Sequence, residues 1–101
     1  MKLGELAQLI RSKNAGPFEL TIDIMFDEPH NFERVRASGV LTRELIARMY
    51  RLAPEQVRFF VVPDALAFKA SMPRPHFQSD LADSDNHGGQ QYAPLMDIEI
   101  P

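Results

Sequence analysis

The chain has 101 residues, which is the common size of one domain, and its 45% hydrophobic and 25% charged residues are typical of a folded protein. Its formal net charge of −3 leaves no basic excess to neutralise phosphates, so a nucleic-acid partner is not expected. No apolar run approaches the roughly 18 residues that span a bilayer, and no cysteine is present, so we expect no membrane partner, disulfide, thiolate nucleophile or sulfur-ligated zinc.

The first segment is predicted to form a short amphipathic helix. Its apolar residues recur at the spacing of one helical face: Leu3, Leu6, Ala7 and Ile10. We expect this helix to end near Asn14, because Gly16 can adopt a positive φ and Pro17 cannot continue a helix. Glu5 interrupts the apolar residues, which is not typical of a secretory signal, so a cytoplasmic location is expected.

A strand and two helices are predicted next. Apolar and polar residues alternate over 18–26, which is the period of a β-strand. Asp27–Gly39 has a capping acid, a proline in the first turn and a glycine stop, and is predicted to be the second helix. Thr42 is the expected cap of a third helix, which Pro54 ends.

The second half of the chain contains three apolar runs. "VRFFVV" (57–62) and "LAFKASM" (66–72) are predicted strands, although the second run could instead form a helical turn. Residues 73–94 show no period and are predicted to form a long irregular loop, of a length that is usually functional, mobile or covered by a partner. "LMDIEI" (95–100) is predicted to be a terminal strand. The order indicates a single α+β domain over 1–101, with a four-stranded, mainly antiparallel sheet and two to three helices packed on it.

Alternation assigns the strand residues to two faces of the sheet. Those expected to face the helices are Phe18, Leu20, Ile22, Ile24, Val57, Phe59 and Val61. Those expected on the other face are Glu19, Thr21, Asp23, Met25, Arg58, Phe60 and Val62. Phe60 and Val62 beside Met25 would form an apolar patch. Either one of the helices covers this patch, or it is the interface of an oligomer or of a complex with another protein.

The polar run Arg11, Ser12, Lys13 and Asn14 has two interpretations. Basic residues and an asparagine at the end of a helix are favourable helix-stop residues. The same side chains form a dense set of hydrogen-bond donors, suited to a carboxylate, a phosphate or a protein partner. Both interpretations remain open at this point.

The acidic part of the long loop contains possible metal ligands. Asp80, Asp83, Asp85 and His87 are spaced as in a calcium loop, but the position of the final bidentate acid is taken by Pro94. A solvated loop is therefore favoured over a weak metal site. No phosphate-binding glycine loop or nucleophile motif is present, so no cofactor is expected. If the chain is an enzyme, a carboxylate or His87 is the candidate general base, and Arg11 or Lys13 is the candidate residue to hold the substrate.

Four motifs in order, "SKNAGPFELT", "LTRELIARMY", "MPRP" and "GGQQYAPLMDIEIP", resemble the signature of a small bacterial family of unassigned function. That family accompanies, or is fused to, the large acyclic-terpene-utilisation proteins. The chain is also distantly similar to the C-terminal domain of those proteins, which implies a ferredoxin-like sandwich. There an Arg-Ser-Gly-Asp-Lys-Gly stretch precedes a strand. Arg11, Ser12 and Gly16 match it, whereas Lys13-Asn14-Ala15 replaces its centre.

The resemblance implies an accessory small subunit that works with a large acyclic-terpene-utilisation-type protein on carboxylic acids or acyl-CoA esters. The joint site would contain Arg11, Ser12, Lys13, Asn14, Gln90, Gln91 and Tyr92, and would receive a carboxylate or acyl-CoA ligand. This interpretation is favoured over two alternatives. One is a freestanding lyase or isomerase of a small carboxylic acid, and the other is a self-associating ligand-binding module without catalysis.

Overall fold

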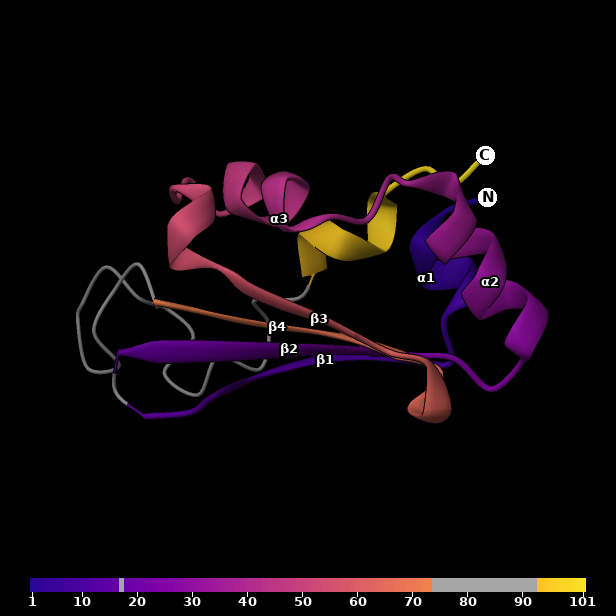
Figure 1. The fold of residues 1–101 in the computed structure, drawn as a ribbon, viewed down its shortest axis with the longest axis horizontal. Coiled ribbons are helices and arrows are strands. Elements are labelled where there is room, and N and C mark those ends of the chain that lie inside the picture. The colour runs from indigo at the N-terminus through magenta and orange to yellow at the C-terminus, as the bar shows by residue number, and fades with distance from the viewer. Residues whose placement is uncertain (17, 74–92) are drawn as a thin grey trace.

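The computed structural model describes residues 1–16, 18–73 and 93–101. Its helices and strands are α1 (Leu3–Leu6), β1 (Leu9–Asn14), β2 (Glu19–Met25), α2 (Pro29–Ser38), α3 (Arg43–Met49), β3 (Arg58–Val62) and β4 (Ala67–Pro73). Three 3-10 turns, η1 (Pro54–Gln56), η2 (Pro63–Ala65) and η3 (Ala93–Asp97), complete the described part. Within it, one antiparallel sheet has the strand order β1-β2-β4-β3. The helices and η3 lie on one side of the sheet (Figure 1), so the expected α+β architecture is confirmed.

The first predicted helix is wrong beyond Leu6. Ala7 already has an extended backbone, with φ −79° and ψ 142°, and β1 follows as the antiparallel neighbour of β2. Backbone pairing along β2 outweighs the weak helical preference of so short a segment. Gly16 has the expected positive φ, +132°, but it lies between two paired strands instead of after a helix.

The predicted strand at the C-terminus is also wrong. The run begins inside η3, and the only β-bridge that its described residues make joins Glu99 to Lys2. Leu95 and Ile100 are 0% and 1% exposed, so burial of two anchors, and not extended pairing, determines this conformation. The fourth strand of the sheet is β1.

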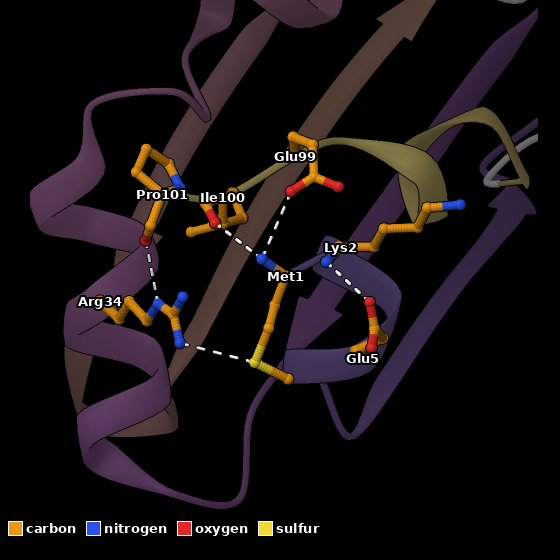
Figure 2. Close-up of polar contacts among 7 residues, drawn as sticks. All are labelled: Met1, Lys2, Glu5, Arg34, Glu99, Ile100 and Pro101. Carbon is orange, nitrogen blue, oxygen red and sulfur yellow. Dashed lines mark hydrogen bonds and ion pairs between the residues drawn. The ribbon is translucent and has the colours of Figure 1, made fainter.

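The first and last residues of the chain hold each other (Figure 2). The Ile100 amide donates to the Met1 carbonyl at 2.8 Å, and the Met1 amino group donates to the Ile100 carbonyl at 3.1 Å. Arg34 Nε, from α2, donates to the backbone oxygen of Pro101 at 3.0 Å. The two ends therefore form one small unit packed beside α2.

The other expected elements are confirmed, with shifted ends. α2 starts at Pro29 and stops at Gly39, whose φ is +68°. Thr42 caps α3, because its hydroxyl oxygen accepts from the Leu45 amide at 3.1 Å. β3 and β4 coincide with the two predicted strands, and the alternative of a helical turn at 66–72 is not adopted. The predicted loop is shortened at both ends, since Pro73 belongs to β4 and 93–94 to η3, and 74–92 lie outside the described residues.

The core lies between the sheet and the helices. An aromatic cluster of Phe26, directly after β2, Phe32 of α2 and Phe68 of β4 has ring centroids 5.1 to 6.0 Å apart. Around it lie buried aliphatic side chains from each layer: Leu3, Leu6, Leu20, Ile22, Ile24, Val35, Ile46, Val57, Met72, Leu95 and Ile100. All of this apolar packing is on the helix side, which leaves the opposite side of the sheet without a described layer.

Candidate binding face of the sheet

The side of the sheet that faces away from the helices is here called the open face. The strand register places its side chains in rows that cross all four strands. The row nearest η2 is apolar and consists of Leu9, Met25, Ala67 and Val62. The next row consists of Arg11, Asp23, Lys69 and Phe60. The third consists of Lys13, Thr21, Ser71 and Arg58. The open face is thus apolar at one end and rich in cations beyond it.

A buried carboxylate lies at the centre of the open face. Asp23 Oδ2 accepts a hydrogen bond from Arg11 Nε at 3.0 Å, and Lys69 Nζ lies 3.7 Å from Asp23 Oδ1. The Asp23 side chain is 10% exposed, whereas those of Arg11 and Lys69 are 52% and 50% exposed. Arg11 and Lys69 flank the single carboxylate of Asp23, so the cluster carries a net positive charge. Each of the two cations keeps exposed donor groups.

A groove of about 280 Å³ lies over this cluster. It is lined by Arg11, Lys13, Thr21, Asp23, Phe60, Lys69, Ala70 and Ser71. Within the described part of the chain Lys13 makes no side-chain ion pair; it is exposed and lines the groove together with Thr21 and Ser71. Three cations, two hydroxyls and one aromatic wall are suited to binding a carboxylate or a phosphate group.

A second ion pair extends the charged rows toward the end of the sheet. Arg58 on β3 pairs with Glu19 on β2, across the intervening β4. Phe18, just before β2, was expected to face the helices, but it is 59% exposed. The reason is that β2 begins only at Glu19. Phe18 lies outside the strand, so the alternation of strand side chains does not direct it toward the core.

The structure splits the polar run into two pairs. Arg11 and Lys13 lie on the open face, while Ser12, 7% exposed, and the half-buried Asn14 are opposite Ile22 and Leu20 on the helix side. The helix-stop interpretation is wrong, because the run is a strand and strand alternation sends neighbouring side chains to opposite faces. Of the predicted site residues, only Arg11 and Lys13 from this run share the groove.

The three apolar residues assigned to the other face are there. Phe60 is 52% exposed, and Met25 and Val62 are half-buried. Within the described residues no helix covers them, because α1, α2, α3 and η3 all lie on the opposite side (Figure 1). Val61 points to the helix side as expected, yet it is 43% exposed because β3 is the last strand of the sheet.

The remaining predicted site residues lie in 74–92, outside the residues that the structure describes. Gln90, Gln91, Tyr92 and His87 belong to 74–92, as do the three aspartates of the acidic segment, so these predictions lie outside the described residues. Within the described ranges, no three His, Asp or Glu side chains gather closely enough to hold a metal ion.

Three residues that line the groove, Lys69, Ala70 and Ser71, were not predicted from the sequence, and two of them are polar. Lys69 and Ser71 stand two positions apart in "LAFKASM", and this spacing in a strand places both on one face. That pattern was the available signal. The spacing alone does not predict that β4 pairs with β2, and this pairing places Lys69 opposite Asp23.

None of the helices in the described ranges is long and apolar enough to cross a lipid bilayer. The fold and the open face together define a small α+β domain with a cationic, partly apolar sheet surface. The chain belongs to the family described as a domain of unknown function (DUF4387), which matches residues 3–99. No match was found among curated proteins or among solved structures.

Proposed function

We propose that this chain is an accessory subunit whose open face docks onto an acidic surface of a larger protein of the acyclic-terpene-utilisation type. The observation that carries the proposal is the cation cluster of Arg11, Lys13 and Lys69 beside the exposed ring of Phe60. The four sequence motifs similar to a family that accompanies those large proteins support the choice of partner. The joint activity would be the breakdown of carboxylic acids or their acyl-CoA esters.

Charge complementarity supports an acidic partner surface. The open face carries four cations, Arg11, Lys13, Arg58 and Lys69. Together with Asp23 and with Glu19, which lies beyond the third row, they give it a formal charge of +2, whereas the whole chain carries −3. A face whose sign differs from that of the molecule orients the chain as it approaches a partner of opposite sign. It also disfavours docking through the acidic remainder of the surface.

The apolar residues of the same face supply the contact area. Phe60 lies between Lys69 and the edge of the sheet, and Val62 and Met25 continue the apolar surface toward η2. Half-exposed aromatic side chains surrounded by polar groups are the usual energetic centres of protein interfaces. The partner would cover Phe60 and meet the cations at the rim.

The groove favours binding over catalysis by the chain alone. Among its described lining residues Asp23 is the only one with a carboxylate, and both oxygens of Asp23 already face Arg11 and Lys69. His30, the single described histidine, is exposed on α2 and is not among the groove residues. The groove would therefore hold the carboxylate or phosphate end of a ligand at the joint surface, and the partner would supply the reacting groups.

The test is co-purification of the chain with a large acyclic-terpene-utilisation-type protein from the same organism, after expression of both together. Lys13→Glu should abolish co-purification, because it reverses a charge in the groove. Arg48→Glu is the matched control, since it changes the net charge equally on an exposed position of α3, on the helix side. The proposal is wrong if the wild-type chain does not bind, or if both variants bind as the wild type does.

A further inference from the structure

The outer edge of β3 has no partner strand among the described residues. β3 is last in the order β1-β2-β4-β3, and its backbone pairs with β4 on one side only. Such an edge presents a row of free amide and carbonyl groups, which is a template for another strand. The two edges of this sheet differ in how they are protected.

β1, the opposite edge, is protected by polar side chains. Arg11 and Lys13 lie on one of its faces, and Ser12 and Asn14 on the other. Charged residues on an edge strand disfavour pairing with a second chain. In β3 the four consecutive residues 59–62 are apolar, with no lysine or proline among them, and Phe60 and Val61 are 52% and 43% exposed.

A wide groove lies beside this edge on the helix side. Its volume is about 680 Å³, and it runs between β3 and the start of α3. Leu41, Val57 and Phe59 form the apolar part of its lining, Arg43, Glu44, Glu55 and Arg58 form the charged part, and Phe60 lines it at the sheet edge. A strand added to β3 would direct alternate side chains toward this groove. The edge therefore offers backbone groups and apolar space to one and the same added strand.

We infer that the occupant is β3 of a second copy of this chain, paired antiparallel about a two-fold axis through Phe60. Phe60 is the middle residue of the five in Arg58–Val62, so this register alone pairs them all. Phe59 then lies opposite Val61 of the second copy on the helix side, and the two Phe60 rings meet on the open face. The contact is self-complementary, as a two-fold interface requires, and joins the sheets into one.

The register can be tested by a cysteine, because the chain contains none. Directly opposed antiparallel residues have Cα atoms about 4.5 or 5.5 Å apart, and both distances suit a disulfide. Phe60→Cys should therefore give a disulfide-linked dimer under mild oxidation on a non-reducing gel. Val62→Cys is the matched control, since its two copies would be about 13 Å apart. Absence of the Phe60→Cys dimer, or equal cross-linking of both variants, would overturn the inference.

Sedimentation equilibrium of the purified chain gives a second measurement. The wild type should be a dimer, and Val61→Lys a monomer with an unchanged circular dichroism spectrum. Leu9→Lys, at the other edge and equally 43% exposed, should remain a dimer. A monomeric wild type at all concentrations refutes the inference, as does a dimer in Val61→Lys. If Val61→Lys fails to fold, the cysteine pair decides. Because no large partner is present, this result is independent of the proposed function.

Discussion

Asp23 and Arg11 join the two strands that the sequence analysis did not pair, through the hydrogen bond of 3.0 Å from Arg11 Nε to Asp23 Oδ2. The Asp23 carboxylate is nearly buried on the open face, with Lys69 on its other side. The negative charge of Asp23 compensates the repulsion between Arg11 and Lys69. The close approach of these two cations on the open face therefore depends on Asp23. Two consequences, for stability and for binding, can be separated experimentally.

Asp23→Ala should lower the free energy of unfolding by about 1–2 kcal/mol, because it removes a charged hydrogen bond and leaves Arg11 facing Lys69. The half-exposed cations remain hydrated, which keeps the loss moderate. Urea denaturation measures the effect. Glu33→Ala, which removes an exposed pair with Arg36, is the control and should change stability by less than about 0.5 kcal/mol. Equal stability of Asp23→Ala and the wild type would contradict this role.

Partner binding through the open face should weaken as salt rises. Lys13, Lys69 and Arg11 are exposed, and ions screen such charges over about 8 Å at physiological ionic strength. Surface plasmon resonance between 50 and roughly 500 mM salt should show a falling association rate with a smaller change in dissociation. Phe60→Ala should do the opposite and mainly accelerate dissociation. A salt-independent association rate would argue against docking through these cations.

Thr42→Ala should destabilise the protein by about 1 kcal/mol, because the cap of α3 is lost and the Leu45 amide has no side-chain acceptor. Thr42→Ser keeps the hydroxyl and should recover most of the stability. Thermal unfolding of the two variants side by side gives the comparison. A serine variant as unstable as the alanine variant would assign the loss to the missing methyl group instead.

Gly39→Ala should cost about 1 kcal/mol, because Gly39 ends α2 with φ +68°. No atom lies within 4 Å of an added Cβ, so backbone strain alone is responsible. Gly39→Asn should cost less, since asparagine tolerates this conformation better. Chemical denaturation measures both, and identical losses in the two variants would not fit a conformational cause.

Ile100→Ala should be the most destabilising of these changes, by about 2–4 kcal/mol, because the side chain is 1% exposed and belongs to the core. Glu99→Ala, one residue earlier, removes only an exposed pair with the Met1 amino group and serves as the control. Urea midpoints of the two variants should differ clearly. Similar midpoints would mean that the last residues do not anchor the fold.

Strong local patterns made most of the elements predictable from the sequence. The alternation in β2, the Thr42 cap and Gly39 each act over a few residues, and the structure confirms them. The two wrongly predicted elements, at β1 and at the C-terminus, are short segments whose conformation depends on distant partners. β1 is extended because β2 pairs with it, and Ile100 is held through Met1.

Part of the candidate groove was also predictable from the sequence. Arg11 and Lys13 were selected as donors, but under a helical interpretation that grouped them with Ser12 and Asn14. Only the strand register separates these pairs and adds Lys69 from β4. Register between strands distant in sequence depends on packing of the whole sheet, so the local pattern of one strand does not reveal it.

The β-bridge between Lys2 and Glu99 also determines where a label, a surface or a fused protein can be attached. Both chain ends emerge together beside α2, on the helix side of the sheet (Figure 1). A surface, a dye or a fused protein attached to either end would therefore lie on the helix side of the sheet, away from Phe60 and Lys13. Immobilisation through either end should present the same side of the sheet to the surrounding solution.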